Sequence, residues 1–581
     1  MCGIFALLNV KKENFEQKLN YDTIYEQFNK GVNRGPEFSK LDDTYNQLML
    51  GFHRLAINGL NNESNQPIVF NDVVLICNGE IYNYKNLYKT MNVTPVTDSD
   101  CEVIIHLYIK YGIEQTLNML DGVYAFVLYD NRNYDTNVNK LYVARDPIGV
   151  RPLYKLSNNC NFYETYNLFG FASELKCLEY FYNLDTSYFN LEQFEPGTYS
   201  YFEFTNFSKP IWNPVFENKP YYLPSFSHTR VTYSVNDLEN EFYHKISYYL
   251  NLAVVKRCIT TERPIACLLS GGLDSSLIAS LVSNYFRKKN KQIETYSIGL
   301  ENSEDIKYAK IVANYIGSKH TEIIVTEDDM FNAIPEVIKA IESYDTTSVR
   351  ASIGNYLIGK YITCHSDAKV IFNGDGSDEL FGGYLYFHKC PDDIEFDKET
   401  RRLLKDIHLF DVLRSDKTIS SHGLEPRTPF LDRSFVNYIL SLPPYFRNHV
   451  NFNQCEKYLL RNSFSLNYFK DKSGRQILPD CILFRKKEAF SDGVSSKGRS
   501  LFQILQERIA QQLNQQTQIF EFTQPKIYEA NIDTEKEYYK NLFLTYYPNC
   551  SHILPYFWMP KYINAVDPSA RTLDIYNKTD S

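Results

Sequence analysis

Two loops near the middle of the chain combine glycine with residues that could bind phosphate or a cation. The first is LLSGGLDSS, residues 268–276, which follows the apolar run 265–268 and precedes apolar residues at helical spacing. A strand, a glycine turn and a helix N-terminus make an anion site, because backbone N–H groups approach the ligand and the helix dipole favours negative charge. No lysine follows the second glycine, which excludes the GxxxxGK[ST] loop. The alternative is a tight turn in an α/β sheet.

The second loop is GDGSDE, residues 374–379, which follows a predicted strand at 370–372. Because the carboxyl ends of parallel strands meet at one edge of a sheet, we expect this loop to face LLSGGLDSS. Carboxylates beside a phosphate site are costly unless a cation joins them, and oxygen ligands suit Mg²⁺. The sequence therefore predicts a magnesium site. A solvated turn, which Gly and Asp both favour, is the alternative.

Cys2 is a third candidate for chemistry. Removal of the initiator methionine is expected to leave Cys2 with a free α-amino group. An N-terminal nucleophile needs no separate histidine, because its own amine, with a pKa of about 8, can act as the base. Taken alone, Cys2 is better explained as a buried N-terminal cysteine, and only the motifs that accompany it favour the nucleophile.

The composition argues against several other classes of protein. The chain has 581 residues, a net charge of −9 and 12 cysteines without a CxxC pair. This length predicts two or more domains, and the charge gives no support for nucleic-acid or membrane partners. The scattered cysteines indicate reduced thiols and a cytoplasmic location, and there is neither an HExxH motif nor an apolar run of about 18 residues. We expect the apolar start, MCGIFALLNV, to be a buried strand rather than a leader.

The second half of the chain alternates predicted strands and helices. A helical pattern starts near residue 235, and the strands predicted after it are 265–268, 294–300, 320–326 and 370–372. Helices are expected at 304–316 and 330–341. This alternation predicts a doubly wound parallel sheet, whose ligands bind at the carboxyl ends of the strands.

Short motifs follow Cys2 in a definite order in the first half. They are RGPE (34–37), HRLAIN (53–58), NGEIYNY (78–84), TDSDCE (97–102), DGVYAFVLYD (121–130) and ARDPIGVRPLY (144–154). The set resembles the N-terminal-nucleophile glutaminase domain of class II glutamine amidotransferases. The resemblance covers essentially the whole of the first 200 residues. The resemblance implies an αββα sandwich that hydrolyses glutamine.

The chemistry of glutamine agrees with the residues that this resemblance assigns. Arg54 suits the substrate carboxylate, Asp100 the ammonium, and Asn78 with the Gly79 N–H the oxyanion of the tetrahedral intermediate. By resemblance, the pocket is also lined by Leu55, Ile57, Asn58 and Glu80. Asn58 is a departure, since an apolar residue is usual there.

Each of these assignments has a structural alternative. Arg54 and Asp100 could form a surface ion pair, and Asn78–Gly79 could be a turn between strands. The segment 68–84 indeed indicates two strands, with the turn around Asn71 and Asp72.

A second set of motifs runs through the other half. It comprises SGGLDS, SYDTTSVRAS (343–352), GDGSDE, YLYFHK (384–389), GLEPRTPFLD (423–432), EKYLLR (456–461) and RKKEAFSDG (485–493). SGGLDS is the pyrophosphate-loop signature of ATP pyrophosphatases, and the whole set resembles the synthetase domain of glutamine-hydrolysing asparagine synthetases. The resemblance implies ATP as a substrate and Mg²⁺ as a cofactor.

The resemblance also implies the roles of individual residues. ATP would be held by Leu268, Ser270, Gly271, Gly272, Asp274, Ser275, Ile298, Asn373 and Gly374. Asp274 and Asp378 would ligate Mg²⁺. Arg350, Asp375 and Glu379 would surround aspartate and its adenylate. Lys457 would stabilise the transition state, although spacing alone also allows it to be a helix-surface cation.

Two positions of the second site depart from the family pattern. Glutamate is usual where this chain has Asp375, and serine where it has Asn373. Aspartate keeps the charge but withdraws it by one methylene, and a misplacement of about 1 Å can cost about 100-fold in rate. Reduced or retuned synthetase activity is therefore one expectation.

We predict a two-domain protein of mixed α/β and α+β class. Its expected parts are a glutaminase domain at 1–205, a linker at 206–234, a doubly wound synthetase domain at 235–520 and an extension at 521–581 that carries no chemical motif and is disordered at its end. The expected function is asparagine synthesis from aspartate, ATP and glutamine-derived ammonia. A homodimer is one possible assembly, which the sequence does not decide.

Three alternatives to this function remain open. They are a related adenylating cyclase with another carboxylate acceptor, a glutaminase impaired in synthesis, and a binding protein without catalysis.

Overall fold

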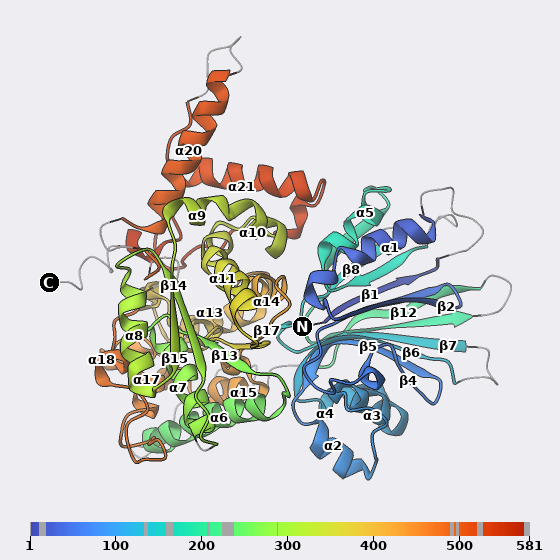
Figure 1. Cartoon of the computed structure of the whole chain (residues 1–581), viewed down its shortest axis with the longest axis horizontal. Coiled ribbons are helices and arrows are strands. Elements are labelled where there is room, and N and C mark those ends of the chain that lie inside the picture. The colour runs from blue at the N-terminus through green and yellow to red at the C-terminus, as the bar shows by residue number, and fades with distance from the viewer. Residues whose placement is uncertain are drawn as a thin grey trace.

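The computed structural model describes residues 2–10, 19–132, 138–158, 167–205, 210–222, 238–287, 289–488, 493–495, 499–519 and 527–573. Figure 1 shows two lobes side by side, an N-terminal lobe built on sheets and a C-terminal lobe rich in helices. None of the helices in these ranges is long and apolar enough to cross a membrane. The predicted disorder at the end of the chain falls on residues outside the described ranges, as do parts of the predicted linker.

Two antiparallel sheets face each other in the N-terminal lobe. The first has the order β10-β8-β9-β1-β3-β2, with β1 Gly3–Leu8, β2 Phe38–Tyr45, β3 Leu48–Arg54, β8 Tyr154–Asn158, β9 Phe169–Ala172 and β10 Phe189–Gln193. The second has the order β12-β11-β7-β6-β5-β4, with β4 Ile68–Phe70, β5 Val73–Ile81, β6 Gly122–Asp130, β7 Val138–Arg145, β11 Thr198–Thr205 and β12 Ile211–Pro220.

Strand β1 explains why the start of the chain is apolar at every position. Ile4, Ala6 and Leu8 pack between the two sheets. Phe5 and Leu7 point the other way and pack with the helices outside. Because side chains alternate along a strand, one that lies inside a sandwich must be apolar on both faces. The predicted first strand is confirmed.

Helices cover the outer faces of both sheets. α1 (Tyr21–Asn29) and α5 (Glu179–Tyr182) pack on the first sheet. α2 (Tyr84–Met91), α3 (Val103–Tyr111) and α4 (Ile113–Met119) lie on the second (Figure 1). The predicted αββα sandwich is therefore confirmed.

The C-terminal lobe is built on a five-stranded parallel sheet of order β15-β14-β13-β16-β17. Its strands are β13 Ile265–Leu268, β14 Glu294–Gly299, β15 Lys319–Ile324, β16 Val370–Phe372 and β17 Glu425–Arg427. The chain runs outward from β13 through β15 and then returns to add β16 on the other side of β13. The order of strands thus reverses between β13 and β16, the place where a doubly wound sheet binds its ligand.

Helices surround this sheet on both faces, as predicted. The helices described in this lobe, including those that pack on other helices, are α6 Leu238–Ile259, α7 Leu273–Arg287, α8 Glu304–Ile316, α9 Glu327–Asn332, α10 Ile334–Ile341, α11 Thr346–His365, α12 Ser377–Phe381, α13 Asp393–Asp406, α14 Asp411–Ser420, α15 Arg433–Ser441, α16 Pro444–Arg447, α17 Tyr458–Ser463, α18 Asp480–Leu483, α20 Leu501–Ile519 and α21 Ile532–Tyr546. Val370 and Phe372 of β16 pack in one core cluster and Ile371 in another, so both faces of the strand are covered.

Two predicted boundaries are wrong. The helix expected at 330–341 is divided into α9 and α10, with Pro335 in the first turn of α10, where its missing N–H removes no helical hydrogen bond. Part of the expected linker is strand β12, which pairs with β11 at the edge of the second sheet. Pro214 and Pro220 made this segment look unlike a strand, because proline cannot donate a ladder hydrogen bond. An edge strand nevertheless tolerates proline, and β12 is such a strand.

The C-terminal segment packs on the rest of the C-terminal lobe through Arg350 of α11. The buried guanidinium donates from Nε to Glu535 Oε1 at 2.8 Å and from Nη1 to Asp567 Oδ1 at 2.7 Å. Gln506 Nε2 of α20 donates to the same two carboxylates, at 3.0 Å each. One arginine thus neutralises two acids that would otherwise be buried without a counter-charge.

We predict that Arg350→Met lowers the free energy of unfolding of this lobe by about 3–5 kcal/mol, because it leaves two carboxylates buried and unpaired. Urea denaturation followed by circular dichroism measures the loss. Lys319→Met is the matched control, since it breaks an ion pair with Glu294 whose lysine is 70% exposed, and should change the transition little. An unchanged midpoint for Arg350→Met would contradict the structural role.

Candidate functional site

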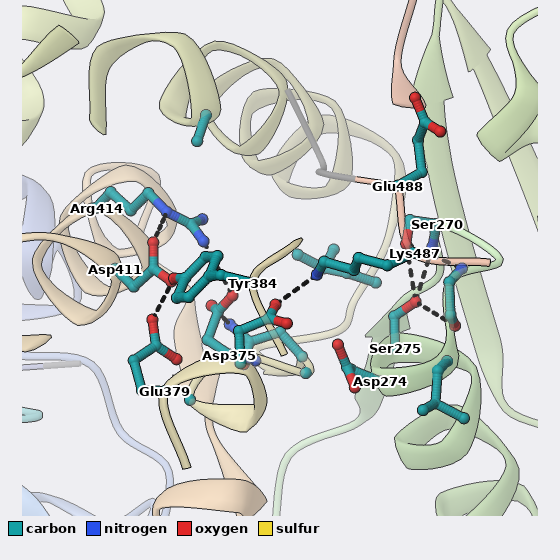
Figure 2. Close-up of a pocket in the computed structure, with 18 of the residues that line it drawn as sticks. Ser270, Asp274, Ser275, Asp375, Glu379, Tyr384, Asp411, Arg414, Lys487 and Glu488 are labelled. Atoms are coloured by element: carbon teal, nitrogen blue, oxygen red, sulfur yellow. Dashed lines mark hydrogen bonds and ion pairs between the residues drawn. The ribbon is translucent and has the colours of Figure 1, made fainter. Parts of the chain in front are cut away.

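A cavity of about 210 Å³ opens at the carboxyl ends of β13 and β16 (Figure 2). The two loops singled out in the sequence form facing walls of it, as expected from the strand order. The lining includes these predicted residues: Leu268, Ser270, Gly272, Asp274, Ser275, Ile298, Asn373, Gly374, Asp375, Asp378, Glu379 and Lys457. Gly271 belongs to the same loop without lining the cavity.

Glycine is required at two points where the loops approach their neighbours. Gly271 has φ +74°, and a Cβ there would lie 2.4 Å from the backbone N of Ala309. A Cβ on Gly374 would lie 2.8 Å from the backbone N of Ser275. The second loop can therefore approach the N-terminus of α7 only because residue 374 has no side chain. This contact brings the two loops together.

The SGGLDSS loop is closed by its own hydroxyls. Ser275 Oγ accepts from the Ser270 backbone N–H at 3.2 Å and lies 3.0 Å from Ser270 Oγ. The Gly272 N–H lies 3.4 Å from Ser270 Oγ. Backbone N–H groups and hydroxyls thus gather at the N-terminus of α7, an arrangement suited to phosphate oxygens.

Two lysines neutralise the two aspartates predicted to bind a metal. Lys457 Nζ lies 2.6 Å from Asp274 Oδ2 and 2.6 Å from Asp378 Oδ1, and Lys487 Nζ lies 2.5 Å from Asp378 Oδ2. Burial acts to raise the pKa of Asp378, but the two ammonium groups outweigh it and hold this pKa well below its usual range. Lys457 has φ +59°, a left-handed conformation that costs a non-glycine residue energy and persists only where the surrounding structure holds it.

Asp375 is held from two sides of the cavity. Asn373 Nδ2 donates to Asp375 Oδ2 at 2.7 Å, and Arg414 Nη2 lies 3.3 Å from Asp375 Oδ1. Burial raises the pKa of Asp375, and Arg414 opposes that shift.

Glu379 belongs to a cluster that the sequence did not reveal. Tyr384 donates its hydroxyl proton to Glu379 Oε1 at 2.5 Å and lies 3.2 Å from Asp411 Oδ2 (Figure 2). Arg414 Nε in turn donates to Asp411 Oδ1 at 2.8 Å. Burial and the neighbouring Asp411 raise the pKa of Glu379 well above its usual value.

Asp411 and Arg414 were missed because they lie on α14, more than thirty residues after the acidic loop and outside every motif. Their spacing, three residues apart on one face of a helix, was the available signal. Lys487 and Glu488 also line the cavity, and they belong to the RKKEAFSDG motif without having been assigned a role.

Arg350 is not among the residues that line the cavity. Its guanidinium is turned toward Glu535 and Asp567 of the C-terminal segment, whereas Ser348 and Ala351 of the same helix face the cavity. The aspartate contact expected for Arg350 stays a prediction, and in this structure the guanidinium is engaged by the two C-terminal acids. Trp558, from the extension expected to carry no chemistry, lines the cavity instead.

The second predicted site begins at Cys2, next to β1. The thiol of Cys2 lies 3.7 Å from the Leu55 carbonyl, and burial raises the pKa of this thiol. Leu55 and Ile57 are buried in a core cluster that also contains Phe242 and Ile246 of α6. The wall of this site is therefore shared with the C-terminal lobe.

Arg54 is surrounded by oxygens that carry no charge. Its Nη1 donates to Asn61 O at 2.8 Å and to Asn65 Oδ1 at 2.6 Å, and its Nη2 donates to the Gly59 carbonyl. Within the described residues, no carboxylate forms an ion pair with it. A guanidinium held in this way is suited to receive the carboxylate of a ligand.

The oxyanion candidates, Asn78 and Gly79, lie inside β5 and pair with Ala125 and Tyr124 of β6. The alternative of a turn at these residues is therefore excluded. The turn lies instead at Asn71 and Asp72, which have φ +48° and +59°.

Asn58, Glu80 and Asp100 form one buried polar group. Asn58 Nδ2 donates to Glu80 Oε2 at 2.8 Å and to the Thr260 carbonyl of the other lobe at 3.2 Å, and it lies 3.4 Å from Asp100 Oδ1. The side chain of Asn58, the residue that departs from the family pattern, thus joins the two carboxylates to the other lobe. Asp100 Oδ2 accepts from the Ile81 N–H at 2.7 Å.

Buried ion pairs connect the two sites across the domain contact. Arg34 donates from Nε to the Cys2 carbonyl at 2.9 Å, and its Nη1 lies 2.8 Å from Asp416 Oδ1 of α14. Arg427 Nη2 lies 3.2 Å from Glu80 Oε2. Asp416 is on the same helix as Asp411 and Arg414, so α14 contacts residues of both sites.

Comparison with known proteins agrees with this arrangement. Residues 1–218 match the family described as glutamine amidotransferase domain, and residues 248–396 and 389–546 match the family described as asparagine synthase. The fold and the two sites therefore define a glutamine amidotransferase joined to a synthetase.

Relatives named asparagine synthetase (glutamine-hydrolyzing) align over nearly the whole chain. Identity is 40% with the Gallus gallus protein, 39% with that of Cricetulus griseus and 38% with that of Homo sapiens, over 99% of this chain and of each relative. The chain belongs to the glutamine-hydrolysing asparagine synthetase family.

The buried carboxyl of Asp100 leads to a prediction about pH. Burial raises the pKa of Asp100 to about 6. A carboxyl with a raised pKa keeps its proton to higher pH, so the carboxylate that could pair with the glutamine ammonium is lost as the pH falls through about 6. We expect kcat/KM for glutamine hydrolysis, which reports the free enzyme, to fall about tenfold per pH unit below that value.

Asp100→Asn should remove the fall of kcat/KM at acid pH, because the asparagine does not titrate. It should also lower kcat/KM for glutamine at every pH. Asp185→Asn, a surface variant, should leave the pH profile unchanged. An unaltered acid limb in Asp100→Asn would assign the titration to another group.

Proposed function

We propose that this protein synthesises L-asparagine from L-aspartate, using ATP and ammonia released from L-glutamine, and forms AMP, diphosphate and L-glutamate. The observation that carries the proposal is the meeting of the SGGLDSS and GDGSDE loops at the strand-order reversal, in a chain whose other lobe has Cys2 beside Arg54, Asn78 and Asp100. Family membership over the full length supports the same conclusion.

At the first site, the Cys2 thiolate attacks the side-chain amide of glutamine. Its α-amino group accepts the thiol proton, and Asn78 with the Gly79 N–H stabilises the oxyanion. Collapse of the tetrahedral intermediate releases ammonia and leaves a glutamyl thioester, which water hydrolyses. Arg54 binds the substrate carboxylate and Asp100 its ammonium, while Leu55, Ile57, Asn58 and Glu80 form the pocket.

At the second site, the aspartate side-chain carboxylate attacks the α-phosphorus of ATP, and diphosphate leaves. ATP is held by the loop after β13 together with Ile298, Asn373 and Gly374. Ammonia then attacks the carbonyl of β-aspartyl-AMP and AMP leaves. Lys457 and Lys487 are positioned to stabilise phosphate charge, and Asp375 and Glu379 lie where aspartate and its adenylate would bind.

The residues present fit a Mg²⁺ ion. Asp274 and Asp378 face each other from the two loops, and magnesium sites commonly combine one or two carboxylates with substrate phosphates. In the described part of the chain, no group of three or more His, Cys, Asp or Glu side chains is arranged to hold a metal. When bound, Mg²⁺ would neutralise phosphate charge; Ser377 Oγ, which donates to Asp274 Oδ1 at 2.8 Å, orients that carboxylate.

The proposal also includes a cytoplasmic location and a homodimer as the assembly to test. The cysteines of the described residues are all free thiols, which supports a reducing compartment. Sedimentation of the purified protein tests the assembly.

Formation of AMP from ATP tests the synthetase half. With aspartate and Mg²⁺, we expect AMP and diphosphate in equal amounts, and little of either with other carboxylates. Removing the metal with EDTA should abolish AMP formation and leave glutamine hydrolysis unchanged. An equal rate with another carboxylate would favour a cyclase-like enzyme, and no AMP under any condition would leave a glutaminase.

Cys2→Ala should separate the two half-reactions. We expect it to abolish glutamine-dependent asparagine formation and to leave the ammonia-dependent rate within about twofold of the parent, because Cys2 acts only in the first site. Ammonium chloride and glutamine are compared as nitrogen donors on the same preparation. Cys364→Ala, at an exposed cysteine, is the control. Equal loss of both activities would contradict the division of labour.

A further inference from the structure

Trp558 brings the C-terminal segment into the wall of the cavity. Among the described residues that line the cavity, it is the one that comes from the chain after α21. Its side chain is 8% exposed and packs in an apolar cluster with Leu403 and Phe410, which line the cavity as well. None of the residues assigned above to the reaction belongs to this segment, so the part that Trp558 plays there is open.

The main chain around Trp558 is anchored independently of the indole. The Trp558 N–H donates to Asp345 Oδ1 at 2.8 Å. Asp345 is buried at the start of α11, where its other oxygen accepts from the Ser348 N–H at 2.8 Å. The Tyr344 hydroxyl donates to the Ser551 carbonyl at 2.7 Å. A substitution of the side chain at 558 leaves these donors and acceptors in place, so its effect reports what the indole does.

The indole packs on the ring of Tyr384. The two ring centroids are 5.1 Å apart and the ring planes are tilted by 53°. Tyr386 stacks on Tyr384 at 5.9 Å and lies 6.3 Å from Trp558, so the three rings contact one another. Tyr386 is fixed by its own hydroxyl, which donates to Glu399 Oε1 at 2.8 Å. Because aromatic rings at such separations attract and orient each other, Tyr384 is held by two neighbouring rings, and Trp558 supplies one of them.

The hydroxyl of Tyr384 reaches two carboxylates at one end of the cavity (Figure 2). It donates to Glu379 Oε1 at 2.5 Å and lies 3.2 Å from Asp411 Oδ2. A tyrosine has a single hydroxyl proton, so only one of the two carboxylates can receive it at a time. The hydroxyl is also the atom farthest from the backbone, and a tilt of the ring displaces it most. A small movement of the ring would therefore break the hydrogen bond to Glu379 and let that carboxyl group turn.

We infer that Trp558 is a positioning residue of the synthetase site. The indole fixes the ring of Tyr384, and Tyr384 in turn fixes the carboxyl group of Glu379. The inference rests on the proposed function, in which Glu379 lies where aspartate and its adenylate would bind. It makes the C-terminal segment part of the machinery of synthesis, through packing rather than through a reacting group.

The alternative is that the indole only fills space in the apolar cluster. Any apolar side chain of fair size would then serve, and leucine at 558 would be nearly as good as tryptophan. Orientation of Tyr384 instead requires a flat ring against it. Phenylalanine should therefore replace the indole, whereas leucine should not.

The test compares Trp558→Phe, Trp558→Leu and Trp558→Ala in the full-length protein. With saturating aspartate, ATP and Mg²⁺, we expect Trp558→Phe to keep kcat for AMP formation within about threefold of the parent. The leucine and alanine variants should lose about 10- to 100-fold, because a misplacement of about 1 Å can cost about 100-fold in rate. Glutamine hydrolysis should stay within about twofold in all three, and urea denaturation followed by circular dichroism checks that the C-terminal lobe is folded.

Phe557→Ala is the matched control. Phe557 is the neighbouring aromatic residue of the same segment and packs on Tyr344, with centroids 5.7 Å apart, without lining the cavity. Its loss removes a similar apolar contact and should leave kcat for AMP formation within about twofold of the parent.

A double-mutant cycle with Tyr384→Phe separates positioning from a merely structural role. This variant keeps the ring and removes the hydroxyl, and should lower kcat for AMP formation by about tenfold or more. Adding Trp558→Leu should then lower kcat by less than about threefold further, because no hydroxyl is left for the indole to position.

The outcomes distinguish this inference from the proposed function. A parent-like kcat in Trp558→Leu, or losses that multiply in the double variant, would overturn the positioning role and leave the proposed function intact. Equal loss of AMP formation and glutamine hydrolysis in the leucine and alanine variants would assign Trp558 to the stability of the fold and overturn it as well. A parent protein that forms no AMP with aspartate would instead refute the proposed function itself.

Discussion

Buried charges that take part of their counter-charge from across the domain contact make the two lobes depend on each other. Arg34 is 1% exposed and lies between Glu174 of its own lobe and Asp416 of the other, at 2.7 and 2.8 Å. Lys417 is likewise buried and pairs with Glu342 and Glu174. An ionised group removed from water costs several kcal/mol unless it is paired. Separation of the lobes would therefore expose these charged groups to water or leave them without an ion-pair partner. The interface thus contributes to the stability of the fold.

Helix α14 connects this interface to the cavity. Arg414 and Ser415 contact Asp375 and Asn373, whereas Asp416 contacts Arg34, which donates to the carbonyl of Cys2. Successive residues of a helix point about 100° apart, so neighbouring positions reach opposite sides. A single helix thus positions groups near the cavity and near Cys2. Any displacement of α14 would change the contacts of Asp375 in the cavity and those of Arg34 beside Cys2.

Where the sequence misled, a local rule was overridden by tertiary context. Strand β12 is polar and contains proline, and it exists because β11 offers a free edge to which it can pair. Asn78 and Gly79, for which a turn was only the alternative, continue a strand because β6 pairs along the full length of β5, and the turn lies at Asn71 and Asp72 as expected. Arg350 belongs to a motif of the synthetase domain, yet its charge is used by Glu535 and Asp567.

The chemistry-bearing loops and the class of the C-terminal lobe could be predicted from residue types and their periodicity, because these constraints are local. The class of the N-terminal lobe was predicted from its resemblance to a family. Gly271 is needed for a positive φ, and β1 must be apolar on both faces of a sandwich. Contacts between distant residues could not be predicted. That Asp411 and Arg414 join the acidic loop depends on how α14 packs against α11, β17 and the other lobe. Such packing is the sum of many weak contacts, and no short stretch of sequence contains it.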